Sequence, residues 1–298
     1  MKIVAIIVAG YLGAGKTTLI NRALEERQGL RSLVLVNDFG DINIDASLIA
    51  QSTDNIISLV NGCACCQIGD DLTQTLEALI SRLDQFDRVI LEASGVANLA
   101  NLRCHFEGLA EHFLLQEVLV VDGSRTNDLI EDKYVGQHIR AQIACARNIL
   151  VTRLEYLDSA GRKRLTNLLN TLNEKVFFVD GLDSLAECDV ELAIKSEKHP
   201  GFHSHVVAGK EPLDTKILED WLAHLPDSIH RVKGYIETEG GWVLLQYVPG
   251  TTELVSVDIQ SIPQNYLGKL SVVCAGENIH KGRLTSPWLQ VDRTTACS

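Results

Sequence analysis

Apolar runs alternate with helix-forming stretches along the first part of the chain. The β-branched apolar runs are 2–9, 32–37, 55–60, 87–93, 117–123, 148–153 and 175–180. Between them, stretches such as 19–26 and 70–83 carry apolar residues at the i, i+3 and i+4 spacing of a helix. Continuous apolar strands that alternate with helices predict an α/β fold with a mostly parallel sheet covered on both faces.

The pattern changes after about residue 181. Residues 182–199 are polar and acidic, and a helix is predicted over 213–225. Further strands are predicted at 203 onward, 231–238, 242–248, 253–259 and 269–275, separated by Glu-Gly-Gly and Pro-Gly turn signals. This meander predicts a smaller domain of α+β type, so we expect one domain over 1–182 and a second over 200–298.

The stretch Gly-Tyr-Leu-Gly-Ala-Gly-Lys-Thr-Thr fits the P-loop pattern G-x-x-x-x-G-K-[ST] between the first strand and the first helix. Its small residues allow backbone N–H groups to converge on phosphate oxygens, and the positive end of the helix dipole faces the same point. A glycine-rich turn that binds nothing is the alternative, which a full match after a buried strand disfavours. The predicted nucleotide-binding residues here are Gly10, Gly13, Ala14, Gly15, Lys16, Thr17 and Thr18.

Three carboxylates follow strands that end near this loop. Glu92 ends an apolar run, where a P-loop protein places the acidic residue that contacts Mg²⁺, with Thr17 as the hydroxyl ligand. Gly95 would let a backbone N–H approach the γ-phosphate. Asp38 and Asp41 follow the second strand and are candidates for contacts with the γ-phosphate or a metal, although Asp-Phe-Gly-Asp is also ordinary turn composition. For Glu92 the alternative is a helix cap.

Cys63, Cys65 and Cys66 form a tight Cys-x-Cys-Cys element between a strand and a helix. Their spacing is too short for a standard zinc finger, but thiolates are ligands suited to Zn²⁺ or Cu(I). Buried cysteines used as small hydrophobes and a redox-active vicinal pair are the alternatives. His203 and His205 are a candidate auxiliary pair of metal ligands. The alternative is that they are exposed strand histidines without a ligand role, which are more common.

The composition restricts the function classes. The chain has 298 residues, 46% of them hydrophobic and 22% charged, which is typical of a folded protein. A formal net charge of −12 disfavours nucleic-acid binding. We expect neither a signal peptide nor a membrane span, and the scattered remaining cysteines indicate no disulfide framework. A reducing cytoplasm is the expected location.

These motifs together resemble the CobW family of P-loop metallochaperone GTPases. The resemblance rests on Gly-Tyr-Leu-Gly-Ala-Gly-Lys-Thr-Thr, Asn-Asp-Phe-Gly-Asp, Asn-Gly-Cys-Ala-Cys-Cys and Glu-Ala-Ser-Gly, and it extends over the whole chain. It implies a P-loop GTPase domain, a CobW-type C-terminal domain, GTP as substrate and Mg²⁺ as cofactor. It also implies that Cys63, Cys65 and Cys66 bind a transition metal, with Zn²⁺ as the first choice, for delivery to a client metalloprotein.

The chain departs from the family at two places. Asp38 and Asp41 stand where members usually carry Glu. Thr152, Arg153 and Glu155 stand where the Asn-Lys-x-Asp element reads guanine. Glu155 retains a carboxylate for guanine N1 and N2 and Arg153 retains a stem that stacks on the base, but Thr152 cannot replace an amide. GTP is expected, while ATP or relaxed specificity stays open.

The sequence therefore predicts a cytoplasmic GTPase that couples nucleotide state to metal transfer, with Lys16, Thr17, Glu92 and Asp41 in the catalytic site. Two other classes stay open. One is a nucleotide-binding regulatory or scaffold protein that moves no metal, and the other is an ATP-using P-loop enzyme. The identity of the client protein and the formation of homo-oligomers are not determined by these patterns.

Overall fold

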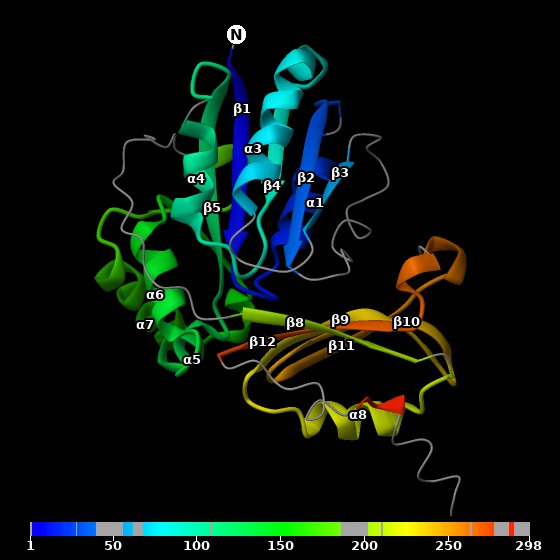
Figure 1. The fold of residues 1–298 in the computed structure, drawn as a ribbon. Helices are drawn as coiled ribbons and strands as arrows, with labels where there is room; N and C mark the ends of the chain where they lie inside the picture. Colours follow the sequence, from blue (N-terminus) through cyan, green and yellow to red (C-terminus); the bar gives the residue numbers. More distant parts are fainter. Residues whose placement is uncertain are drawn as a thin grey trace, which may run out of the picture. The chain divides into compact units, whose positions relative to one another are not determined.

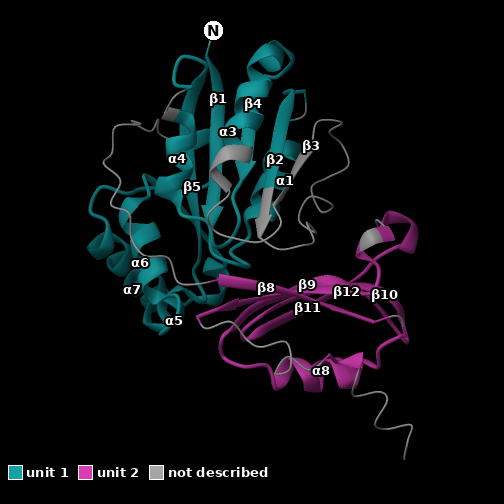
Figure 2. Ribbon diagram, in the orientation of Figure 1, with its two compact units in different colours: residues 1–39, 48–199 teal, residues 40–47, 200–298 magenta. Residues whose placement is uncertain are grey.

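The computed structural model describes residues 2–27, 29–39, 56–61, 68–107, 109–185, 202–209, 211–262, 264–276 and 286–288. These residues form two compact units (Figure 2). Unit 1 contains the described residues up to 185, and unit 2 contains those from 202 onward. No helix among the described residues is long and apolar enough to cross a membrane.

Unit 1 is built on a seven-stranded sheet (Figure 1). Its strands are β1 (Ile3–Gly10), β2 (Ser32–Phe39), β3 (Ile56–Asn61), β4 (Arg88–Glu92), β5 (Phe113–Asp122), β6 (Asn148–Thr152) and β7 (Phe177–Phe178). Their order is β3-β2-β4-β1-β5-β6-β7, and every strand pair recorded in the described part of the sheet is parallel. The predicted parallel α/β sheet is therefore confirmed.

The connecting helices of unit 1 cover this sheet. They are α1 (Lys16–Glu26), α3 (Ile68–Leu79), α4 (Leu99–Glu107), α5 (Thr126–Glu131), α6 (Gly136–Cys145) and α7 (Ser159–Leu172), with short 3₁₀ segments at Ile80–Gln85, Leu154–Tyr156 and Leu182–Ser184. Strand β4 is buried along its whole length, and β1 is buried at all but one position, because helices cover both faces. Strand β1 pairs with β4 on one side and with β5 on the other, and the sheet order reverses direction there, which is the point where parallel α/β sheets bind ligands.

A buried ion pair joins the helices to the sheet. Arg103 of α4 donates to both carboxylate oxygens of Glu117 in β5, and both side chains are buried. Arg103 also donates to the Cys145 carbonyl at 2.5 Å, and the Arg147 backbone N–H donates to Glu117 at 3.0 Å. Since a buried charge is costly unless it is paired and hydrogen-bonded, this network fixes α4 against β5 and the end of α6.

Among the strands of unit 1, β5 and β7 differ most from the expected lengths. Strand β5 begins at Phe113, four residues before the predicted start, because the alternation of buried and partly buried residues extends backward to that position. Strand β7 contains only Phe177 and Phe178, the two residues that pair with β6. Before it, the Asn173 side chain donates to the Ile143 and Ala146 carbonyls at 2.8 and 2.7 Å. The two phenylalanine side chains are 54% and 45% exposed.

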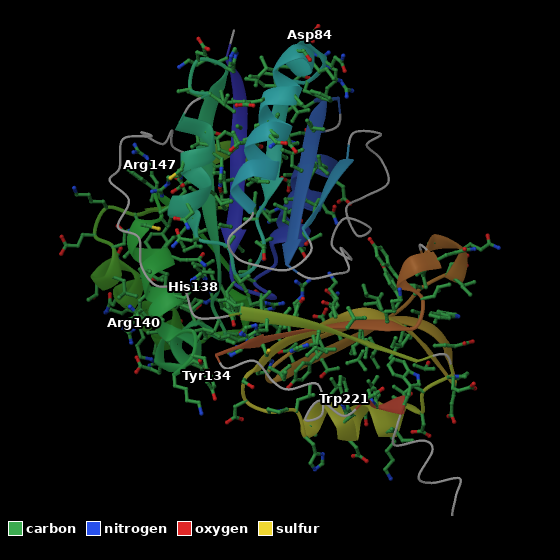
Figure 3. The ribbon with its side chains drawn as sticks, in the orientation of Figure 1. Asp84, Tyr134, His138, Arg140, Arg147 and Trp221 are labelled. Atoms are coloured by element: carbon green, nitrogen blue, oxygen red, sulfur yellow. The ribbon has the colours of Figure 1, made fainter. Side chains whose placement is uncertain are left out.

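Unit 2 is a five-stranded antiparallel sheet with one helix packed on it. The strands are β8 (Phe202–Ala208), β9 (Ile229–Thr238), β10 (Gly241–Val248), β11 (Thr251–Ser256) and β12 (Lys269–Ala275), in the order β11-β10-β9-β12-β8. Helix α8 (Thr215–Ala223) begins after Asp214, whose side chain accepts hydrogen bonds from two backbone N–H groups. It buries Leu218, Trp221 and Leu222 against the sheet, as the labelled Trp221 illustrates (Figure 3). The expected α+β character of this unit is confirmed.

Candidate nucleotide-binding site

The P-loop leaves the carboxyl end of β1 and opens α1. Gly10 has a φ of 142°, and a β-carbon at this position would overlap the Val120 carbonyl of the neighbouring strand. Gly15 lies just before α1 with a φ of 99°, in the left-handed region that other residues rarely adopt. The loop therefore turns tightly over β5 and leads straight into the N-terminus of α1, whose first N–H groups and positive dipole end suit an anion.

Lys16 lies across the loop. Its Nζ donates to the Gly10 carbonyl at 3.0 Å and to the Tyr11 carbonyl at 3.4 Å, and the side chain is only 8% exposed. These carbonyl groups hold the ammonium over the concave side of the loop. The structure therefore places the predicted phosphate-contacting cation at the P-loop.

Thr17 and Glu92 meet beside the loop. The Thr17 hydroxyl donates to Glu92 Oε1 at 2.7 Å, although 75 residues separate the two in sequence. The contact follows from the sheet register, since Glu92 at the end of β4 lies opposite Val8 of β1, two residues before the P-loop begins. Glu92 is 3% exposed. A hydroxyl and a carboxylate brought together at a partly buried position are a fitting pair of oxygen donors for a hard divalent cation.

Gly95 packs directly against the loop. A β-carbon on Gly95 would lie 2.5 Å from Leu12 Cδ2 and 2.9 Å from the Leu12 backbone nitrogen. A residue with a side chain would therefore displace either the turn after β4 or the P-loop. This contact brings the predicted γ-phosphate segment beside the loop.

The segment after β6 is also attached to the P-loop. The Thr152 hydroxyl donates to the Ala14 carbonyl at 2.9 Å. Arg153 donates to the Gly13 carbonyl at 2.8 Å and to Asp122 Oδ2 at 2.6 Å. Arg153 has a φ of 55°, and among the described residues no other non-glycine residue has a positive φ. Such a conformation persists only when surrounding contacts enforce it, and the two hydrogen bonds supply those contacts.

Asp122 is a site residue that the sequence reading missed. It ends β5, is buried, and accepts hydrogen bonds from the Ser124 N–H and hydroxyl as well as from Arg153. Its position in the sequence could have identified it, because an aspartate at the carboxyl end of a buried parallel strand lies at the ligand-binding edge of the sheet. Thr18 and Glu155, in contrast, are exposed, and neither side chain has a hydrogen-bond or ion-pair partner among the described residues.

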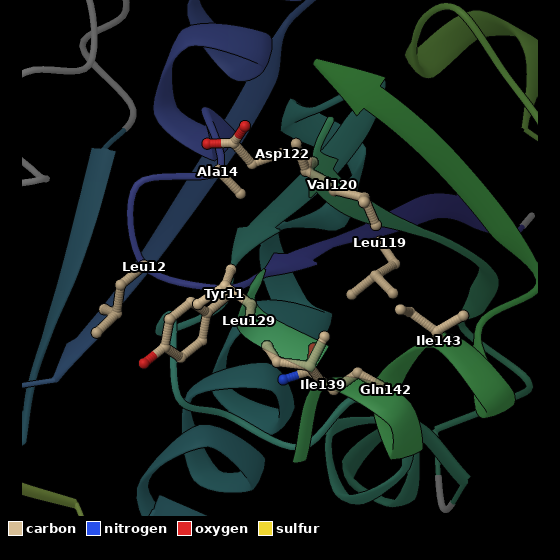
Figure 4. Close-up of a pocket in the computed structure, with 11 residues that line it drawn as sticks. Tyr11, Leu12, Ala14, Leu119, Val120, Asp122, Leu129, Ile139, Gln142 and Ile143 are labelled. Atoms are coloured by element: carbon tan, nitrogen blue, oxygen red, sulfur yellow. The ribbon is translucent and has the colours of Figure 1, made fainter. Parts of the chain in front are cut away.

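A small cavity lies behind the P-loop (Figure 4). Its volume is about 20 Å³, and most of its lining is apolar, contributed by Tyr11, β5, α5 and α6. That volume suits one water molecule and not a nucleotide. Burial raises the pKa of the Tyr11 hydroxyl well above its ordinary value, so this hydroxyl stays protonated. The cavity belongs to the support of the loop.

Several predicted site residues lie outside this description. Asp41, Cys63, Cys65 and Cys66 fall outside the described residues, and for Asp38 only the backbone, in β2, is described. His203 and His205 lie in β8 opposite Cys274 and Val272. Within the described part of the chain, no group of three or more His, Cys, Asp or Glu side chains is arranged to hold a metal.

Comparison with known proteins covers both units. Residues 4–180 match the family described as CobW/HypB/UreG, nucleotide-binding domain, and residues 202–285 match the cobalamin synthesis protein cobW C-terminal domain. The zinc chaperone YjiA of Escherichia coli (strain K12) is 28% identical over 284 residues, which cover 85% of this chain and 87% of that protein.

One further relative matches over a shorter stretch, and one solved structure aligns over most of the chain. Zinc-regulated GTPase metalloprotein activator 1 of Schizosaccharomyces pombe (strain 972 / ATCC 24843) is 31% identical over 137 residues, or 43% of this chain and 33% of that protein. A crystal structure of Zn(II)-bound YjiA GTPase from E. coli aligns over 97% of this chain and 99% of that chain, with 19% sequence identity and a TM-score of 0.46.

Proposed function

The chain belongs to the CobW/HypB/UreG family, and on that premise we propose that it is a GTP-hydrolysing metallochaperone. It would bind a transition metal, with Zn²⁺ as the first choice, at Cys63, Cys65 and Cys66 and release it to a client metalloprotein as the nucleotide state changes. The observation that carries the nucleotide half is the Thr17–Glu92 hydrogen bond beside a complete P-loop.

Mg²⁺ fits this site because the two side chains that meet there offer oxygen donors. Thr17 and Glu92 would hold the ion, Thr17 through its hydroxyl and Glu92 directly or through water. When bound, Mg²⁺ neutralises charge on the β- and γ-phosphates. Lys16 already lies over the loop and would exchange its carbonyl contacts for phosphate oxygens as the nucleotide binds.

The base would bind beside the segment that follows β6. Thr152 and Arg153 both donate to P-loop carbonyls, so these groups orient the segment. Glu155 is exposed, and we assign its carboxylate to guanine N1 and N2, with the Arg153 stem against the base. This assignment favours GTP, and a site that uses ATP is the competing possibility because the usual amide is replaced by Thr152.

The metal half is supported by the names of the relatives, which describe zinc chaperones and a zinc-regulated GTPase. The Cys-x-Cys-Cys element supplies thiolates, which suit Zn²⁺. Asp38 and Asp41 lie between the P-loop strand and this element in sequence, and we propose that the γ-phosphate and Mg²⁺ order their loop and that hydrolysis releases it. Free thiolates require a reducing compartment, so we place the protein in the cytoplasm.

The test is phosphate release by the reduced protein from GTP and from ATP, each with Mg²⁺ and each with Mg²⁺ removed by chelation. We expect Mg²⁺-dependent release from GTP that is faster than from ATP and that is lost in Lys16→Met. Lys163→Met, at an exposed position of α7, is the matched control and should behave as the wild type. Release from ATP at an equal or higher rate would overturn the GTPase assignment, and absence of release from both without an added acceptor would favour a kinase or a scaffold.

A further inference from the structure

Strand β8 places two histidines on one face of the unit 2 sheet. It is the last strand in the order β11-β10-β9-β12-β8, so in the described sheet it pairs on one side only, with β12 (Figure 1). His203 lies opposite Cys274 and His205 lies opposite Val272. Val272 and Cys274 belong to the apolar cluster that packs with α8. Because residues directly opposite each other in an antiparallel pair share a face, both histidines lie on the α8 side of the sheet.

The spacing of these histidines suits two ligands of one metal ion. Residues two apart on a strand are separated by about 6.4–6.8 Å and point to the same face. Bonds between Zn²⁺ and imidazole nitrogen are about 2.0–2.1 Å long. Two rings that lean toward each other can therefore reach one ion without a change in the backbone. Both side chains are partly exposed, so an ion can approach them from water.

The ring of His205 has a nitrogen without a partner. Its Nε2 is buried and forms no hydrogen bond. Among the described residues, neither the His203 nor the His205 side chain has a hydrogen bond or an ion pair. A buried nitrogen of this kind is costly unless it is satisfied. A metal ion that accepts the lone pair of Nε2, with the ring proton on Nδ1, would satisfy it.

The donor set selects the class of ion and the type of site. Cys274 is not a third ligand, because its Sγ donates to the His203 carbonyl at 3.5 Å and the residue is fully buried. This agrees with the absence of any group of three potential ligands among the described residues. Two imidazoles suit Zn²⁺, Cu²⁺ or Ni²⁺ and not Mg²⁺, and they leave coordination positions for water. Such a site is open and exchanges its ion, unlike a closed structural zinc site with four protein ligands.

We propose that His203 and His205 form a second metal site, within unit 2, that binds Zn²⁺ or a similar divalent cation through one nitrogen of each ring. This inference goes beyond the proposed function and does not depend on the Cys-x-Cys-Cys element.

The test follows the histidine ring nitrogens of the full, reduced chain by ¹⁵N–¹H correlation during titration with Zn²⁺. The titration is run on the wild type and on a variant with Cys63→Ser, Cys65→Ser and Cys66→Ser, so that the two metal sites are distinguished. We expect the His203 and His205 signals to move together, at one free Zn²⁺ concentration that is the same in both proteins. Mg²⁺ at that concentration should move neither signal.

The variants His203→Gln and His205→Gln each leave a single imidazole. We expect Zn²⁺ affinity at the remaining ring to fall at least about tenfold, because the second bond of the chelate is lost. His224→Gln is the matched control, since His224 is an exposed histidine at the end of α8 whose Nδ1 lies 2.7 Å from the Asp220 carbonyl. Unchanged backbone amide signals of β12 would show that the variants retain the sheet.

Several results would overturn the proposal. They are His203 and His205 signals that stay in place, movement of only one of them, or different midpoints for the two. Loss of the shifts in the cysteine variant, unchanged affinity in His203→Gln or His205→Gln, or an equal loss in His224→Gln would overturn it as well.

Discussion

The Thr17 hydroxyl donates a 2.7 Å hydrogen bond to Glu92 Oε1 at the point where β4 ends beside the P-loop. Glu92→Gln preserves an oxygen that accepts this bond but removes the negative charge. We therefore expect an intact fold with a raised Mg²⁺ requirement and a fall in GTP turnover of about 10- to 100-fold, the range found when partners of a metal site are changed.

The measurement for Glu92→Gln is the Mg²⁺ concentration that gives half-maximal phosphate release. Glu25→Gln is the matched control, because Glu25 is an exposed carboxylate of α1 that has no recorded contact in the described chain. An unchanged Mg²⁺ requirement in Glu92→Gln would show that this carboxylate does not serve the metal.

Arg153 attaches the base-binding segment to the P-loop through the Gly13 carbonyl and Asp122. Arg153→Gly retains the left-handed conformation and removes the guanidinium. We expect nucleotide affinity to fall about tenfold or more, since hydrogen bonds to charged groups contribute about 1.5–3 kcal/mol each. Equilibrium binding of a fluorescent GDP derivative measures this.

Asp122→Asn should weaken nucleotide binding in the same direction, because Asp122 orients Arg153. Arg140→Gln provides the control, since Arg140 pairs with Glu131 on the surface of α5 and α6. If both Arg153→Gly and Asp122→Asn bound nucleotide as tightly as the control, the attachment would have no role in binding.

Gly95 lies against Leu12, and an added methyl group has no room there. Gly95→Ala should displace the P-loop and reduce both nucleotide affinity and thermal stability. Gly181→Ala is the comparison, because its new methyl group would meet nothing closer than the Arg22 guanidinium at 3.5 Å, in an extended backbone. Differential scanning fluorimetry with and without GDP reports both effects, and equal melting curves for the two variants would contradict the predicted close contact.

Burial raises the pKa of the Cys145 thiol from 9.0 to about 11, although the Arg103 guanidinium opposes the shift. The thiol is therefore protonated at pH 8, and its thiolate fraction is about a hundredfold lower than in the unfolded chain. Alkylation of Cys145, followed by mass spectrometry, should be slower by that factor in the native protein than in urea. Comparable rates in both states would mean that the thiol is not buried.

The same shift has a consequence for stability. The folded chain holds this proton more tightly than the unfolded chain. The contribution of Cys145 to the free energy of unfolding is therefore fully present below pH 9 and is lost as the pH rises toward 11. Relative to Cys145→Ala, the wild type should lose free energy of unfolding across that interval. A constant difference between the two proteins over the interval would argue against the raised pKa.

Sequence patterns predicted the parallel sheet and the P-loop because both depend on local signals. The run of apolar residues at 2–9 predicts a buried strand, and the pattern around Lys16 predicts its loop. Glu92 was predicted for the same reason, since the carboxyl end of a strand is visible in the sequence. The pairing of Glu92 with Thr17 depends on strand order, which places β4 beside β1 and is not written in either segment.

Other features depend on contacts that no local pattern records. Asp122 was missed because its role depends on Arg153, which approaches from the neighbouring strand β6. Strand β7 was overestimated because Lys175 and Val176 are as suited to a strand as Phe177, whereas only Phe177 and Phe178 pair with β6.

The central claim is that nucleotide state and metal binding are coupled, and such coupling must be reciprocal. The direct test is the Zn²⁺ affinity of the reduced protein by chelator competition, measured with Mg²⁺ plus a non-hydrolysable GTP analogue, its ATP counterpart, GDP, or no nucleotide. We predict a difference of about 5- to 150-fold between the GTP-analogue and GDP states, which disappears in Cys65→Ser. Equal Zn²⁺ affinity in all four states would contradict the claim and leave a nucleotide-binding protein whose metal site is independent.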